Sequence, residues 1–553
     1  MTDRTETVRL AGTPVSPGLA QGFIHLQHTL LGPIDVPEPI IRGDVEEEFS
    51  RLDAATVSIS NDLLALATRV EKEFDARLSN VFEAHQIMAN DPAIREELRK
   101  EIAENLISAG SAVKTVFLRW EKRFLLMESQ VAKDKSADMH DISLRLRKAL
   151  AGITVHPLDR IPHGCVLVIS RLLPSDTVFL AGRSIAAVLM EHGSVASHAA
   201  LFAREMGLPC ISKIPGLLNP ASVGALALVD ADTGTVTIHP RKQEQEIFRK
   251  KIEDKERSYT YARERAAIPA TTKDGITVSV LANVCSKEDT EKAMLNGAKG
   301  VGLYRMEQAY LGCVMPPTMD ELLDEMRWTL EAAKKRPVTV RLLDVGADKP
   351  LPFIRFLAES NPSLGRRGIR LLREYPELLK THLRAVLELS RDFDVRVLVP
   401  MVTLADDVAI VKECLARLGQ ELGLSALPRI GAMIETPAAA LSARKLAPYV
   451  DFLSFGTNDL TQYAFAADRE NAAVEQYFDD ASHVIFRLMQ IVHNDVPEMP
   501  LSVCGELAGR PEHISRLLQC GVRTLSVAPA LIPMTKEAIR KSTCGPAPRG
   551  RAE

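Results

Sequence analysis

Residues able to bind a phosphate and a metal ion follow one apolar stretch in the C-terminal part of the chain. Residues 450–455 form an apolar run, and Asn458, Asp459 and Arg469 come soon after it. Carboxylate oxygens are ligands for Mg²⁺, whereas the arginine fork binds phosphate or carboxylate groups. This combination indicates an anionic substrate held beside a hard cation. A turn capped by Asn or Asp, followed by a surface arginine, is the plainer alternative for this segment alone.

Two further apolar runs end in residues that can do chemistry. Residues 429–434 lead to Glu435, and Pro437 follows, where a strand ladder cannot continue. Residues 501–503 lead to the thiol of Cys504. A thiol held over a ligand can give a proton to carbon or take one from it, a role suited to an enolate.

These residues need a scaffold that brings the ends of several strands together. Helical segments separate most of the apolar runs in the C-terminal half, and a longer excursion follows the third run. Alternation of this kind fits an α/β fold, a (β/α)8 TIM barrel with an insertion after its third strand. The eight predicted strands are residues 276–283, 300–304, 338–343, 395–401, 429–434, 450–455, 501–504 and 524–527.

Charged residues collect at the predicted carboxyl ends of these strands, where barrels carry their chemistry. Charges at one end of an apolar barrel must be paired or must bind something, because a lone buried charge is costly. Several arginines beside a magnesium site favour a small substrate with both carboxylate and phosphate groups, although any single residue could belong to a salt bridge at the rim. The candidates are Arg305, Glu307, Arg341, Asp344, Asp348, Lys349, Arg366, Arg367, Arg370, Glu435, Asn458, Asp459, Arg469 and Cys504.

The N-terminal half contributes one candidate nucleophile, His198. It follows a strand and a loop rich in Gly and Ser, and it lies where a helix is expected to begin. Free N–H groups and the positive end of the helix dipole would favour a phosphoryl group carried on its ring. A histidine near a helix cap can also be purely structural, and we interpret the nearby His192 in that way.

Composition narrows the class of protein. The chain has 553 residues, of which 46% are hydrophobic and 25% charged, and its formal net charge of -4 offers no overall basic surface for nucleic acid. We see neither a signal peptide nor an apolar run long enough to enter a membrane, so a cytoplasmic location is the expectation. The eight cysteines form no CxxC pairs and have no histidines at metal spacing, which indicates neither a disulfide framework nor a zinc site.

Changes in composition and in the spacing of apolar residues divide the chain into four parts. Residues 1–42 and 151–240 read as one α/β domain, interrupted by a helical subdomain at 43–150 whose predicted helices, 45–74 and 93–148, suggest two long hairpins. Residues 241–270 read as a solvated linker helix, and 271–553 as the barrel. The charges of the helical subdomain indicate a solvated face or, less simply, a docking surface.

An ordered set of motifs covering nearly the whole chain resembles the Enzyme I family of the phosphoenolpyruvate-dependent phosphotransferase system. The matching stretches are SPGLAQG, SHAALFAREMGLPCI, GVGLYRME, LLDVGADK, NPSLGRRGIR, IETPAAA, SFGTNDLTQY and CGELAG. The resemblance implies a phosphohistidine domain interrupted by a helical domain that docks the carrier protein HPr. It also implies a barrel that binds phosphoenolpyruvate and Mg²⁺, in a homodimer.

The resemblance also implies site residues and a reaction. His198 would be the phosphorylated nucleophile, and Cys504 the proton donor to the enolpyruvate carbon. Glu435 and Asp459 would ligate Mg²⁺, with Asp459 also near the substrate. A ring nitrogen of His198 would attack phosphorus, enolpyruvate would leave and be protonated, and HPr would receive the phosphate. Phosphoenolpyruvate contacts would come from Arg305, Arg341, Asn458 and Arg469, with Arg367 and Lys349 as possible additional contacts.

The histidine loop departs from the family pattern, which leaves alternatives open. The family usually reads GG-x-T-S-H there, whereas Ser194 replaces a Gly and Ala196 replaces the Thr. Loss of the Thr hydroxyl would remove a hydrogen bond near His198, roughly 0.5 to 1.5 kcal/mol if neutral. One alternative is therefore a catalytically weakened phosphorelay or regulatory protein. Another is an enzyme like pyruvate phosphate dikinase or phosphoenolpyruvate synthase, which the short, largely helical segment before His198 disfavours.

Overall fold

The structure is a computed structural model. Contacts divide the chain into two compact units, Met1–Lys255 and Glu256–Glu553, which are described separately. Among the helices of the described residues, none has both the length and the apolar composition of a membrane-spanning segment. The structure describes residues 7–27, 37–73, 76–125, 130–153, 158, 161–173, 176, 179–180, 184–193, 200, 203, 206–218, 222–310, 313, 315–346, 351, 353–354, 359–469, 471 and 474–545.

The first unit contains an eight-stranded sheet in the order β1-β8-β7-β3-β4-β5-β6-β2. The run β3-β4-β5-β6 is parallel, whereas β7, β8 and β1 continue one side as antiparallel strands and β2 pairs antiparallel with β6. Apolar side chains such as Val166 and Val229 are fully buried against this sheet. The strands are β1 Val8–Ala11, β2 Thr13–Ser16, β3 Leu19–Leu26, β4 Val166–Ile169, β5 Ala187–Met190, β6 Cys210–Ser212, β7 Leu226–Asp230 and β8 Thr235–Ile238.

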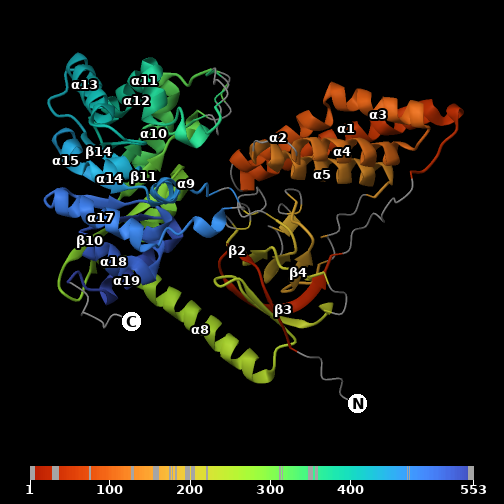
Figure 1. Ribbon diagram of the computed structural model, residues 1–553, viewed down its shortest axis with the longest axis horizontal. Coiled ribbons are helices and arrows are strands. Elements are labelled where there is room, and N and C mark those ends of the chain that lie inside the picture. Colours follow the sequence, from red (N-terminus) through yellow and green to blue (C-terminus); the bar gives the residue numbers. More distant parts are fainter. Residues whose placement is uncertain are drawn as a thin grey trace. The chain divides into compact units, whose positions relative to one another are not determined.

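A helical insertion separates β3 from β4 (Figure 1). Asp91 starts one of its helices: the carboxylate accepts hydrogen bonds from the N–H groups of Ala93 and Ile94, and Pro92 occupies the first turn. Helix α1 packs against α2, and α4 packs against α5, whereas α3 ends at Leu106, which has a left-handed conformation. The predicted helical range 45–74 corresponds to α1, and the range 93–148 covers α3, α4 and most of α5. The helices are α1 Val45–Glu73, α2 Ala76–Ala89, α3 Pro92–Asn105, α4 Ala109–Leu125 and α5 Gln130–Leu150.

The predicted linker segment is a single long helix, α8 (Lys242–Glu264). Its side chains are almost all exposed, as its dense charge predicted, and Ala262 is its one buried residue. Within the first unit Glu244 pairs with Arg9 at 2.6 Å and Lys251 pairs with Asp230. These ion pairs fix the beginning of α8 to the α/β sheet.

Eight parallel strands in the second unit close into a barrel, which confirms the predicted fold. Each strand pairs with the next one, and β10 pairs with both β11 and β17, so that the sheet has no free edge. The short β9 (Ala270–Thr271) adds antiparallel to β10. The barrel strands are β10 Thr277–Val284, β11 Val301–Arg305, β12 Val338–Arg341, β13 Val395–Val399, β14 Arg429–Ile434, β15 Phe452–Phe455, β16 Leu501–Val503 and β17 Thr524–Val527.

Side chains of the barrel strands alternate between the surrounding helices and the interior. Val395, Val397 and Val399 belong to the large core beneath the helices, whereas Leu398 packs inside the barrel with Cys504. The helices are α9 Lys287–Leu295, α10 Met319–Ala332, α11 Ile369–Glu374, α12 Pro376–Leu389, α13 Ala405–Glu421, α14 Pro437–Leu441, α15 Ala443–Leu446, α16 Thr457–Phe465, α17 His483–Asp495, α18 Ile514–Gln519 and α19 Ile532–Lys541.

Candidate active site

The carboxyl ends of the barrel strands carry most of the predicted site residues. Arg305 and Arg341 are the last residues of β11 and β12, and Glu435 directly follows β14. Cys504 directly follows β16. Asp459 lies in the first turn of α16, the helix that follows β15. Because carboxyl ends of parallel strands meet at one mouth of a barrel, these side chains share one end of the second unit.

Arg341 is held by two carboxylates at this mouth. One of its terminal nitrogens donates to Glu307 at 2.7 Å and the other to Asp344 at 2.9 Å. The Glu307 carboxylate also accepts the backbone N–H of Asp344 at 3.2 Å. Burial by itself would lower the pKa of Arg341, but Glu307 and Asp344 outweigh it and raise that pKa. The guanidinium is therefore a fixed positive charge at the barrel mouth.

Arg367 joins two acidic residues that are far apart in sequence. Its guanidinium donates to Asp344 through two nitrogens, both at 3.1 Å. It also donates to both oxygens of Asp459, at 2.9 and 3.1 Å, and to the hydroxyl of Tyr463 at 3.3 Å. Burial works to lower the pKa of Arg367, yet Asp344 and Asp459 together raise it. The residue that we predicted as an additional substrate contact thus bridges two carboxylates.

Glu435 is 1% exposed, and its carboxylate accepts a hydrogen bond from the backbone N–H of Met401. Burial, with the nearby charges of Asp459 and Asp344, raises the pKa of Glu435 to about 8. The carboxylates of Glu435 and Asp459 repel each other when both are ionised. A cation placed between them would stabilise both ionised forms.

The backbone around Glu435 is closely fitted. Met401 adopts a φ of 54°, and Gly368 a φ of 56°. A Cβ atom on Gly368 would lie 3.0 Å from the Met401 side chain and 3.1 Å from Asp344. Glycine at 368 is required both by its left-handed conformation and by this close approach, which brings Arg367 beside the acids.

Cys504 is 4% exposed and lies at the top of the apolar plug of Leu303, Leu398 and Met433. Its Sγ lies 3.5 Å from the carbonyl oxygen of Phe455, to which the thiol can donate. Burial raises the pKa of this thiol, so Cys504 keeps its proton at neutral pH. A protonated thiol is the form that a proton donor needs.

The remaining predicted residues of the mouth differ in their surroundings. The Asn458 side chain accepts from the backbone N–H of Glu506 at 3.1 Å. Arg305 and Arg469 are exposed, and within the described part of the chain neither forms an ion pair, which leaves both guanidinium groups available to an anion. His198, Asp348 and Lys349, together with Ser194 and Ala196, lie outside the described residues.

Two participants of the network escaped the sequence analysis. Tyr463 accepts from Arg367 and donates to the carbonyl of Ser363 at 2.5 Å, and the Met401 backbone holds Glu435. Tyr463 lies in the SFGTNDLTQY stretch, one turn beyond Asp459 on α16, so helical spacing could have revealed it. A backbone donor such as Met401 leaves no signal in residue type.

The donor set at the mouth suits a magnesium ion that shares its coordination with a substrate. Mg²⁺ is usually bound by one or two carboxylates, with waters and substrate phosphates completing the octahedron. Glu435 and Asp459 supply two such carboxylates; burial first, and then the neighbouring acids Asp459 and Asp344, raise the pKa of Glu435. Among the described residues no group of three or more His, Cys, Asp or Glu side chains is arranged to hold a metal by itself.

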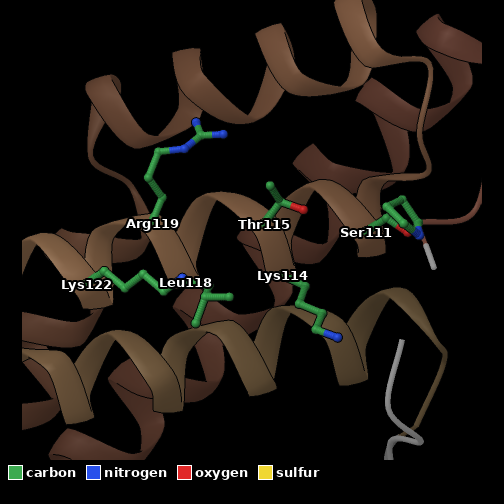
Figure 2. A pocket seen from close by; sticks show the side chains of 7 residues that line it. Ser111, Lys114, Thr115, Leu118, Arg119 and Lys122 are labelled. Carbon is green, nitrogen blue, oxygen red and sulfur yellow. The ribbon is translucent and has the colours of Figure 1, made fainter. Parts of the chain in front are cut away.

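A separate hollow of about 380 Å³ lies in the first unit, against α4 (Figure 2). The cationic side chains of Lys114, Arg119 and Lys122 line it, and Arg119 is paired with Glu101 at 2.9 Å. None of the predicted site residues lines this hollow, so it is distinct from the barrel mouth.

Three family models match consecutive parts of the chain. The phosphoenolpyruvate-binding domain of phosphoenolpyruvate-utilising enzymes matches residues 260–544, which include every described residue of the mouth. The N-terminal domain of these enzymes matches residues 11–135, and their mobile domain matches residues 161–234.

Curated relatives agree with this assignment over nearly their full length. The phosphoenolpyruvate-protein phosphotransferase of Geobacillus stearothermophilus is 31% identical over 508 residues, 90% of this chain and 87% of the relative. Proteins of the same name from Mycoplasma pneumoniae (94% of this chain, 91% of the relative) and Bacillus subtilis (90% and 89%) are also 31% identical. The chain therefore belongs to the phosphoenolpyruvate-protein phosphotransferase family, enzymes that use phosphoenolpyruvate to phosphorylate a protein.

Proposed function

We propose that this enzyme transfers the phosphoryl group of phosphoenolpyruvate to His198 with release of pyruvate, and then to a histidine of HPr or an HPr-like carrier. The observation that supports this most is that a proton donor, a fixed positive charge and two carboxylates lie together at the barrel mouth. A buried, protonated thiol at Cys504 shares that mouth with the fixed charge of Arg341 and the paired acids Glu435 and Asp459.

Substrate binding is assigned to the cationic and amide groups of the mouth. Phosphoenolpyruvate carries a phosphate and a carboxylate, and guanidinium groups can bind both with two hydrogen bonds each. The exposed guanidinium groups of Arg305 and Arg469 are free to close on the anion, whereas that of Arg341 is already oriented by its carboxylates. Asn458 contributes a side-chain amide, and Arg367 and Lys349 are possible additional contacts.

The chemical step is an in-line displacement at phosphorus. A ring nitrogen of His198 forms a bond to phosphorus as the bond from phosphorus to the enol oxygen breaks, and the electron pair stays on enolpyruvate. Cys504 then gives its proton to the methylene carbon, which yields pyruvate and leaves a thiolate to be reprotonated from solvent. The guanidinium groups stabilise negative charge on the oxygens of the transferring group.

Magnesium is the cation that we assign to the mouth, with Glu435 and Asp459 as its protein ligands. When bound, Mg²⁺ would supply positive charge that neutralises the phosphoryl oxygens. The ionised form of Glu435, which burial disfavours, is the form that can ligate the ion. Chelation of the metal should therefore abolish phosphoryl transfer.

The domain boundaries follow the same proposal. We assign residues 1–42 and 151–240 to the phosphohistidine domain, 43–150 to the subdomain that docks the carrier, 241–270 to the linker and 271–553 to the phosphoenolpyruvate-binding barrel. The active form is proposed to be a homodimer. The loop that carries His198 must reach the barrel mouth during the first transfer and the carrier during the second.

The test is a transfer reaction with a defined acceptor. Purified enzyme, phosphoenolpyruvate and Mg²⁺ are mixed with an HPr-type protein, and pyruvate and phosphorylated carrier are both measured. We expect one pyruvate per phosphoryl group on the carrier, no requirement for ATP and no product when the metal is chelated. Formation of phosphorylated carrier without pyruvate, or only with ATP, would contradict the proposal.

A further inference from the structure

The guanidinium of Arg367 donates to four carboxylate oxygens, those of Asp344 and Asp459. Its side chain is 10% exposed, and it donates to both oxygens of Asp344 and both oxygens of Asp459. A guanidinium that forms two double-pronged contacts with carboxylates serves as their counter-ion. Together with Arg341, which also pairs with Asp344, Arg367 supplies the positive charge that allows these acids to lie buried beside Glu435.

The two carboxylates held by Arg367 are not equivalent. Asp344 is anchored elsewhere, because it also accepts from Arg341 at 2.9 Å and its backbone N–H donates to Glu307 at 3.2 Å. For Asp459, the ion-pair partner within the described part of the chain is Arg367. The guanidinium can thus leave Asp459 and keep its contact with Asp344, which would act as the pivot.

The contact with Asp459 conflicts with a metal ion on the same carboxylate. A divalent cation bound to Asp459 would lie within a few ångströms of the guanidinium, and like charges at such a distance repel strongly when they are shielded from water. Both positive charges cannot keep their full contacts with one carboxylate at low cost. Arg367 must move away from Asp459 or weaken the binding of the cation.

We propose that Arg367 is a built-in competitor of the divalent cation: it neutralises Asp459 in the free enzyme and releases it when the cation binds, pivoting on Asp344 toward the anionic substrate. This inference rests on the metal site proposed above. It assigns Arg367 a second task, because its guanidinium becomes available to a phosphate or carboxylate only after Asp459 has a different partner. Cation and phosphoenolpyruvate would consequently strengthen each other's binding.

If Arg367 competes with the cation, removal of its positive charge should strengthen metal binding. In Arg367→Gln the acids lose their resident counter-ion, so Mn²⁺ should bind about tenfold tighter or more than to the wild type, with phosphoenolpyruvate absent. Arg367→Lys keeps the charge but not the double-pronged contact, so it should lie between the two. Free Mn²⁺ measured by electron paramagnetic resonance at pH 8 gives the affinity directly.

Arg370→Gln is the matched control for this experiment. Arg370 lies three residues further along, and its guanidinium donates to the carbonyls of Leu364 and Gly365 and to the hydroxyl of Thr403. Removal of this charge should change Mn²⁺ affinity less than twofold. Circular dichroism and thermal unfolding verify that each variant is folded. If Arg367→Gln does not fold, Mn²⁺ affinity is compared between Arg367→Lys and the wild type.

The results separate this inference from the function on which it rests. If Mn²⁺ binds to the folded Arg367 variants as tightly as to the wild type, or more weakly, Arg367 does not compete with the cation. In Asp459→Asn and Glu435→Gln we expect Mn²⁺ binding to be lost. Unchanged Mn²⁺ binding in those two variants would overturn the metal site itself, whatever Arg367 does.

Discussion

At the scale of single residues, the barrel mouth keeps its buried charges by pairing them. Arg341 and Arg367 share Asp344, each donating to its Oδ2 atom, at 2.9 and 3.1 Å. Removal of one member of such a set leaves an uncompensated charge, which typically costs about 3 to 5 kcal/mol. Each charged residue of the mouth is therefore needed to keep its partners compensated.

Cys504 provides a direct test of proton donation at the mouth. We expect Cys504→Ser to slow pyruvate formation about 10²- to 10⁴-fold, because a hydroxyl is a much weaker acid than a thiol. Binding of phosphoenolpyruvate, measured by calorimetry, should change little. Cys520→Ser is the control, since Cys520 is also buried but donates to the Phe486 carbonyl away from the mouth. Equal rates in the wild type and Cys504→Ser would contradict the role.

The sequence predicted which residues lie at the ends of the barrel strands but not the contacts among them. Glu435 and Cys504 could be predicted because each directly follows an apolar run, and the fold brings such positions together. The bridge from Arg367 to Asp459 spans 92 residues and depends on side-chain rotamers and on the left-handed conformation of Gly368. Such pairing depends on how the side chains pack in the folded barrel. The spacing of apolar residues in the sequence does not predict it.

At the scale of elements, α12 carries a buried histidine that should make the barrel sensitive to acid. His382 is 0% exposed, and within the described part of the chain neither ring nitrogen has a hydrogen-bond partner. Burial lowers the pKa of His382 from 6.5 to about 4. The unfolded chain then binds more protons between those values, so stability is lost as pH falls below about 6.5.

The expected loss is about 2 kcal/mol between pH 7.5 and pH 5, from the difference in proton binding at this one side chain. His382→Leu should remove that share of the pH dependence. Urea unfolding in a Trp120→Phe background isolates the barrel, because Trp328 is then the only tryptophan. His483→Leu, at an exposed position of α17, should retain the wild-type slope, and a His382→Leu variant that also retains it would contradict the prediction.

The elements themselves were predicted unequally well. All eight barrel strands and α8 were anticipated, because buried parallel strands read as short apolar runs and a solvated helix as a dense run of charge. In the first unit, β6 (Cys210–Ser212) and β7 (Leu226–Asp230) were not singled out from the sequence; β6 has only three residues, too few to show a period. α2 was also missed as a separate helix, although Val81, Phe82 and His85 follow helical spacing.

At the scale of the whole molecule, the chain separates its chemistry between two units. The barrel of Glu256–Glu553 carries the groups that suit phosphoenolpyruvate and a cation, whereas His198 belongs to Met1–Lys255. Family membership and this division together make phosphoryl transfer between units the central claim. The prediction is specific to one of 13 histidines.

The most direct test uses phosphoenolpyruvate labelled in its phosphate group, with Mg²⁺ and no carrier protein. We expect one acid-labile phosphate per chain in the wild type, assigned to His198 by tandem mass spectrometry, and none in His198→Ala. His192→Ala, which changes an exposed histidine beside the same loop, should still be labelled. Label that persists in His198→Ala, or that maps to another residue in the wild type, would contradict the account.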